Sequence, residues 1–113
     1  MTLNQYGNSN VAVGTYALNN NSTGSYTIAL GESAVSTNTT NSNSTAIGYE
    51  ALKNATGNLN TSVGFQSGTN SSVGQNNVTG YNNTFVGSYS TVNGTGFYNA
   101  TALGYQAVAP NSN

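Results

Sequence analysis

The chain has 113 residues, of which 3% are charged, and its formal net charge is −1. So little charge leaves no basic patch for phosphate backbones or anionic lipids, which argues against nucleic-acid partners and membrane-surface binding. The lack of cysteine and histidine excludes disulfides and the commonest metal ligands, and no stretch reaches the roughly 20 apolar residues of an inserted membrane span.

One short pattern recurs along almost the whole chain. Each copy has a β-branched residue, a residue that is usually small, a branched apolar residue and then a glycine. The six glycines are Gly14, Gly31, Gly48, Gly64, Gly87 and Gly104. Their spacings of 17, 17, 16, 23 and 17 residues are typical of a stacked solenoid. The sequence therefore predicts one all-β domain over residues 1–113, a parallel β-solenoid (β-roll) of about six to seven coils of 16–17 residues.

The three residues before each glycine predict a strand, because they alternate and have strand propensity. These strands are expected at 11–13, 28–30, 45–47, 61–63, 84–86 and 101–103. After each glycine we expect a corner, a second short strand and a polar turn such as Asn21-Ser22-Thr23-Gly24. The irregular segment 65–81 interrupts the period, either by a degenerate extra corner at 71–74 or by a longer loop.

Side chains one before and four after each glycine are expected to point into the coil. The small residues two before the glycine then point outward and form a flat oligomer face. Its members are Ala12, Ala29, Ala46 and Ala102. The alternative is that small residues merely fit a tight corner. Because each coil buries few apolar side chains, we expect the chain to associate with copies of itself.

The pattern N-[ST]-x-A-[IVL]-G-x-x-[AS]-[LV] resembles the head repeats of trimeric autotransporter adhesins and the Asn/Thr/Gly-rich repeats of phage and viral tail fibres. Residues 43–52 (NSTAIGYEAL) and 99–108 (NATALGYQAV) match best, and the resemblance covers roughly residues 8–108. It implies a left-handed parallel β-roll with three chains around one axis, located extracellularly, on a cell surface or on a virion. The adhesin heads have a shorter repeat, so this chain is closer to the tail-fibre repeats.

These features favour a non-catalytic structural fibre module that self-associates laterally as a trimer, with end-to-end stacking into a fibril as a further option. The alternative is a receptor-binding adhesin or tail-fibre domain that recognises host-surface glycans. Aromatic side chains bind sugar rings, and the candidate ligand-facing residues are Tyr16, Tyr81 and Tyr89. Structural stacking between coils is the other reading of the aromatic residues, above all for Tyr49, Phe65 and Tyr105, which directly follow their glycines.

The sequence offers few side chains that could act as a general acid or base. Glu32 and Glu50 are the only carboxylate side chains and occupy different positions in their coils, whereas paired carboxylates must lie roughly 5–9.5 Å apart across a substrate. Glu50 is equally well placed to pair with Lys53, and the serines have no histidine partner. We expect no enzyme, no catalytic or metal site and no cofactor.

Asn-x-Ser/Thr sequons are abundant along the chain. The sites in polar turns are Asn21, Asn54, Asn77 and Asn93, and these are the candidates for covalent N-linked glycans, which would solvate a fibre that lacks charge. Alternatively, the sequons are a by-product of a repeat built from Asn, Ser and Thr.

Overall fold

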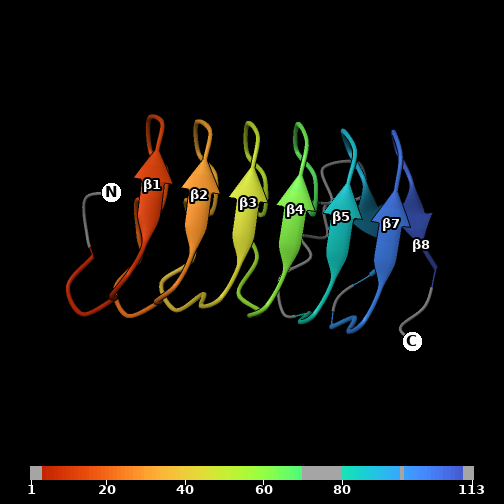
Figure 1. The fold of residues 1–113 in the computed structure, drawn as a ribbon. Coiled ribbons are helices and arrows are strands. Elements are labelled where there is room, and N and C mark those ends of the chain that lie inside the picture. Colours follow the sequence, from red (N-terminus) through yellow and green to blue (C-terminus); the bar gives the residue numbers. More distant parts are fainter. Residues whose placement is uncertain (1–3, 70–79, 95, 111–113) are drawn as a thin grey trace.

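The computed structural model of the chain describes residues 4–69, 80–94 and 96–110, and this part contains short strands and no helix. The strands are β1 (Val11–Val13), β2 (Ile28–Leu30), β3 (Thr45–Ile47), β4 (Thr61–Val63), β5 (Thr84–Val86), β6 (Thr91–Val92), β7 (Thr101–Leu103) and β8 (Val108–Ala109). Six form one parallel sheet in the order β1-β2-β3-β4-β5-β7, and β6 pairs with β8 (Figure 1). The predicted all-β parallel solenoid is confirmed, and each strand of the large sheet occupies the three residues before a repeat glycine.

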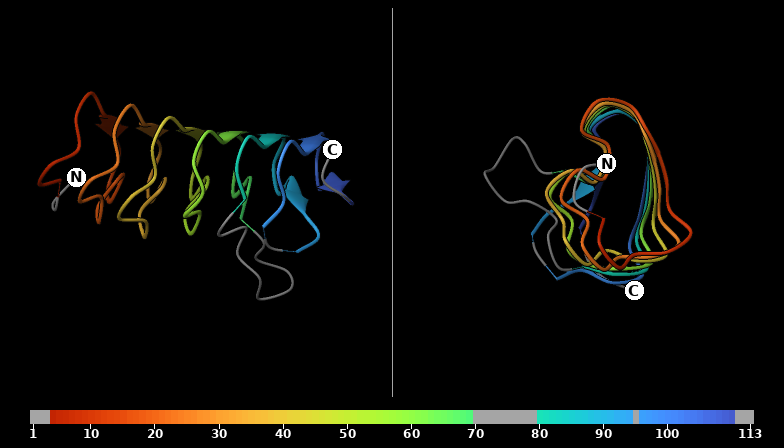
Figure 2. Two further views of the ribbon diagram at one scale, coloured as in Figure 1. Left: turned by 90° about the horizontal axis from the view of Figure 1, so that it is seen from below. Right: turned by 90° about the vertical axis from the view of Figure 1, so that its left-hand side faces the viewer.

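The chain winds as a left-handed coil. In Figure 1 it rises along the front strands, returns behind them and advances by one strand per turn. Five complete turns separate β1 from β7, and the coils superimpose when viewed along the axis (Figure 2, right). Equivalent residues pair in register, so that Ala29 lies beside Ala46 in the next coil. A column of equivalent positions in the sequence is therefore a column of neighbours in space.

A glycine makes the sharp corner at the end of each strand of this sheet. Gly48 has a φ of 131°, which L-residues with a side chain rarely adopt. A Cβ at Gly48 would also lie 2.3 Å from the carbonyl oxygen of Gly64 in the next coil. The corner glycines thus permit both the turn and the close stacking of one coil on the next, near the usual strand separation of about 4.8 Å.

The predicted side-chain directions are reversed in the strands. Ala29 and Ala46 are fully buried, Ala102 is buried and Ala12 is partly buried against the core, so the proposed oligomer face Ala12, Ala29, Ala46 and Ala102 is wrong. The interior of the coil is narrow, and in the first three coils it holds the residues four after the glycine, whereas Val108 at this position in the last coil is exposed. Leu18, Val35 and Leu52 are fully buried there, as predicted. Opposite them only small side chains fit.

Buried polar side chains four residues before the glycines link successive coils. Asn60 Oδ1 accepts a hydrogen bond from the Asn83 N–H at 3.0 Å, and Asn60 Nδ2 donates to the Gly80 carbonyl at 2.8 Å. Asn83 repeats the arrangement, accepting from the Ala100 N–H at 2.9 Å and donating to the Phe97 carbonyl at 2.8 Å. Both side chains are fully buried. These amides satisfy backbone groups just before each strand begins, where the regular ladder has not yet started.

Among the described residues, the second strand predicted after each glycine is present only in the last two coils, where β6 pairs with β8. In the earlier coils the equivalent residues Leu18, Val35 and Leu52 lie in turns and have positive φ values of 48°, 51° and 50°. In the irregular segment 65–81, residues 70–79 lie outside the described residues, and so does the suggested corner at 71–74. The described parts on either side place β4 directly beside β5.

Candidate interaction surface

The outer side of the six-stranded sheet carries two parallel columns of side chains, which together we call the outer sheet face. The column just before the glycines is Val13, Leu30, Ile47, Val63, Val86 and Leu103. The column three before the glycines is Val11, Ile28, Thr45, Thr61, Thr84 and Thr101. All of these side chains are exposed or half-exposed; Val13 and Leu103 retain 61% and 65% of their accessible surface.

This face is uncharged and mostly apolar, with four threonines among its twelve side chains. One column consists entirely of Val, Leu and Ile, and the other of Val, Ile and Thr. Parallel sheets are almost always covered on both faces, and a contiguous exposed apolar patch marks a contact surface. The inner face of this sheet packs on the coil interior, whereas the outer face has no cover within the described chain. It is the strongest candidate for an interaction surface.

The sequence already contained a signal for this orientation. In β1, the bulky Val11 and Val13 flank the small Ala12, and in β2, Ile28 and Leu30 flank Ala29. Residues i and i+2 of a strand point the same way. A thin coil has no room for two columns of bulky side chains besides the buried leucines. The small central residue must therefore point inward.

An aromatic ladder runs along the corner that follows the glycines. Tyr49 stacks on Phe65 with ring centroids 5.1 Å apart, as expected from the sequence. Phe65 meets Tyr89 edge-on at 5.3 Å, and Tyr89 meets Tyr105 edge-on at 6.3 Å. Tyr105 is therefore part of the ladder through Tyr89. Ring contacts of this kind stabilise adjacent coils by about 0.5–1.5 kcal/mol per pair beyond their buried area.

The three aromatic residues proposed to face a ligand differ in their surroundings. Tyr16 is exposed in the coil of β1, whereas Tyr89 is half-buried in the ladder in the coil of β5, four rungs or about 19 Å along the axis. Tyr81 is exposed and stacks on Tyr98. Tyr16 and Tyr89 thus occupy equivalent positions, two residues after their glycines, but in coils four rungs apart. Recognition of glycans through them stays a prediction from the sequence.

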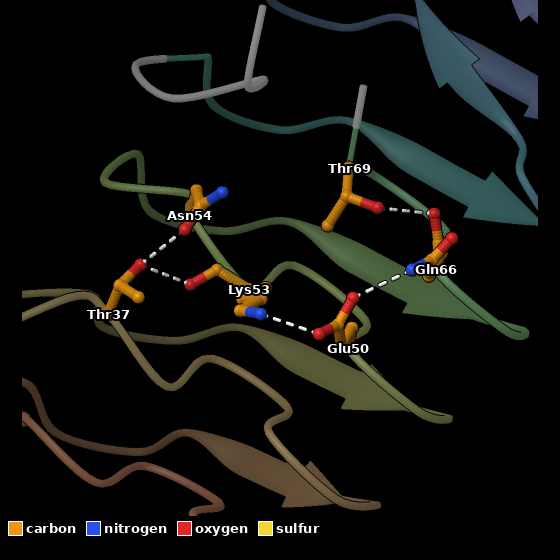
Figure 3. Close-up of polar contacts among 6 residues, drawn as sticks. All are labelled: Thr37, Glu50, Lys53, Asn54, Gln66 and Thr69. Carbon is orange, nitrogen blue, oxygen red and sulfur yellow. Dashed lines mark hydrogen bonds and ion pairs between the residues drawn. The ribbon is translucent and has the colours of Figure 1, made fainter. Parts of the chain in front are cut away.

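Glu50 and Lys53 form an ion pair at the corner after β3, with Nζ and Oε1 2.5 Å apart (Figure 3). Gln66 in the next coil donates from Nε2 to the second carboxylate oxygen, Oε2, at 2.7 Å. These contacts, led by the Lys53 hydrogen bond, lower the pKa of Glu50. The neighbouring Glu50 charge raises the pKa of Tyr49. The carboxylate is thus held ionised by structural partners.

The proposed glycosylation sites differ in how far their side chains are exposed. Asn21 is fully buried, and its Nδ2, the atom that would carry a sugar, donates to Asn4 Oδ1 at 2.9 Å and to the Gly24 carbonyl at 2.8 Å. A glycan on Asn21 is incompatible with this packing, so that assignment is wrong. Asn54 is half-buried and accepts from Thr37 (Figure 3). Asn93 is exposed, and Asn77 lies outside the described residues.

Other kinds of site find no support in the part of the chain that is described. It holds no group of three or more His, Cys, Asp or Glu side chains that could bind a metal ion. It also has no helix of the length and hydrophobicity needed to cross a bilayer. Comparison of the chain with protein-family models, with curated proteins and with solved structures found no match.

Proposed function

We propose that the protein is a non-catalytic structural fibre module of an extracellular, cell-surface or virion appendage, and that it self-associates laterally as a trimer through the outer sheet face. The observation that supports this proposal is the uncovered apolar face of a parallel sheet. The resemblance of the repeat to adhesin-head and tail-fibre repeats points in the same direction.

A second copy of the same chain suits this face better than a charged partner. The face carries no charge, and Glu50 and Lys53 are paired with each other at the corner. Rungs near 4.8 Å apart repeat along both copies, so the side chains of one face fit between the rungs of another along its whole length. In a closed cyclic arrangement, the outer sheet face of every copy is covered by its neighbours.

The two-column width of the face favours three copies. Each strand is three residues long and presents one side chain in each column. Around a threefold axis, one column packs against each of the two neighbouring chains, and the apolar residues shield each other from water. At about 25 cal/mol per Å² of buried apolar surface, this contact adds the burial that a thin single coil lacks.

The test introduces a charge into the centre of the face. Ile47→Glu places a carboxylate in the column before the glycines, where the side chain is exposed in the single chain, so the fold is expected to tolerate it. Thr23→Glu places the same charge on an exposed turn away from the face. Analytical ultracentrifugation over a range of concentrations measures the mass of each.

We expect a trimer for the unmodified chain and for Thr23→Glu, and a monomer with unchanged circular dichroism for Ile47→Glu. An unmodified chain that stays monomeric at all concentrations would refute the proposal. A trimer that persists in Ile47→Glu would place the interface on another face.

A further inference from the structure

We propose that Tyr81 and Tyr98 form a cross-linking site. Exposed to a one-electron oxidant, such as a haem peroxidase with hydrogen peroxide, their rings couple to an intrachain dityrosine that joins two consecutive coils. This proposal concerns a different surface from the outer sheet face and does not depend on self-association.

The backbone holds the two tyrosines in register. They form an isolated parallel bridge. The Tyr81 N–H donates to the Phe97 carbonyl at 3.1 Å, and the Asn99 N–H donates to the Tyr81 carbonyl at 3.3 Å. The hydrogen bonds on both sides of Tyr98 keep the two Cα atoms at strand spacing. Directly paired residues of a parallel bridge point their side chains the same way.

The rings are arranged for coupling. Their centroids are 5.6 Å apart and their planes differ by 13°, so equivalent edges of the two phenols lie side by side. Tyr81 and Tyr98 are 48% and 44% exposed, which leaves the phenols accessible to an oxidant. A small closing motion of two partly exposed side chains brings the carbons ortho to each hydroxyl together.

The other ring contacts of the described residues are less suitable. Tyr49 stacks on Phe65, and phenylalanine forms no phenoxyl radical. Tyr89 and Tyr105 are 6.3 Å apart with planes at 78°, an edge-to-face arrangement that separates their ortho carbons. The chain contains no Cys and no Trp, and it has a single Met. Radicals on tyrosine therefore have few competing side chains to oxidise.

The reaction balances with peroxide as the oxidant. Each phenol loses one electron and its hydroxyl proton to give a phenoxyl radical. The two radicals form one carbon–carbon bond between ortho positions, and the ring protons shift to restore both phenols. One hydrogen peroxide takes up two electrons and two protons and becomes two molecules of water. The chain loses two hydrogen atoms in total.

The experiment treats the full chain with horseradish peroxidase and hydrogen peroxide at low protein concentration. Dityrosine fluorescence and intact mass are measured on the band that runs as a single chain on a denaturing gel, and digestion followed by mass spectrometry identifies the joined residues. Tyr98→Phe preserves the stacked ring but removes the phenol. Tyr16→Phe removes a phenol that is more exposed than those of Tyr81 and Tyr98 and has no ring contact among the described pairs.

We expect a single-chain product lighter by two hydrogens, with Tyr81 joined to Tyr98, and a higher melting temperature because the link closes a loop in the unfolded chain. Tyr98→Phe should lose most of the single-chain dityrosine signal, and Tyr16→Phe should keep it. Tyr81→Phe repeats the test if Tyr98→Phe misfolds. Links only between chains, a link at another pair, or an undiminished signal in both Tyr81→Phe and Tyr98→Phe would overturn the proposal.

Discussion

At the scale of single residues, two separate requirements can call for glycine at a corner. The first is a backbone with positive φ, which is 131° at Gly48 and 113° at Gly104. The second is the close approach of the next coil, which exists at Gly48, where a Cβ would lie 2.3 Å from Gly64 O. At Gly104 an added Cβ meets none of the described atoms within 4 Å. The two glycines therefore separate the conformational demand from the steric one.

Alanine at these positions measures the two effects. Gly104→Ala should lower the free energy of unfolding by about 1–2 kcal/mol, the cost of a side chain at positive φ. Gly48→Ala adds a clash with backbone atoms and should cost about 3–5 kcal/mol in total. Urea denaturation followed by circular dichroism gives both values. Equal losses in the two variants would show that stacking distance does not constrain the corner.

At the scale of the coil, the fourth and fifth repeats differ from the earlier ones in which buried position carries the bulky side chain. In earlier coils the residue two before the glycine is small and the one four after it is bulky, and both lie in the buried core, as Ala46 and Leu52 do. The fourth coil instead has Gly68 at the bulky position, and the fifth has Phe85 at the small one. A Cβ at Gly68 would lie 3.0 Å from Phe85 Cδ2 and 2.6 Å from Leu52 Cδ2. The fully buried Phe85 ring thus occupies space that Gly68 leaves free.

A double-mutant cycle tests this exchange. Phe85→Ala should cost about 3–5 kcal/mol through the cavity it creates, and Gly68→Leu about 1–3 kcal/mol through overpacking. The double variant restores the pattern of the earlier coils, so its loss should be smaller than the sum by about 1–3 kcal/mol. Thermal unfolding of the four proteins supplies the comparison. Strict additivity would mean that the two sites do not share a space.

At the scale of the whole molecule, ionisation contributes little to stability. The chain has one basic and two acidic side chains and no histidine. Glu50 has a pKa lowered in the folded state, chiefly by its hydrogen bond with Lys53. The unfolded chain therefore binds a proton at a higher pH than the folded chain does, and stability rises with pH across that window. The contribution is present above the unfolded pKa of about 4.3 and is lost as the pH falls through the folded value.

We therefore expect the melting temperature to be nearly constant between about pH 6 and pH 8, where no side chain of this composition normally titrates. At pH values under about 4, the melting temperature should decrease. The acid-dependent loss should be about 1 kcal/mol or less, as for other partly exposed ion pairs. Glu50→Gln should abolish this loss, whereas the exposed Glu32→Gln should retain it. A steep change near neutral pH would contradict this account.

Much of the fold could be predicted because the same residue types recur at the same positions of every repeat. The glycines mark the corners, and the residues before them mark the strands, so that positions such as Thr45–Ile47 are correct to the residue. The buried leucines after the corners were also predictable. The second strand was predicted too widely because Leu18 and Leu52 adopt positive φ, which their residue type does not indicate.

The sequence by itself determined the period, the strands and the self-stacking of one coil on the next. Only the tertiary structure decided which side of each strand faces the interior. A three-residue strand such as Thr45-Ala46-Ile47 could bury either of its two faces. The path of the chain after Gly48 determines which one is buried. That path depends on the positive φ values of Glu50 and Leu52. The same choice buries Ala46, exposes Ile47 and makes the outer sheet face the candidate surface for association.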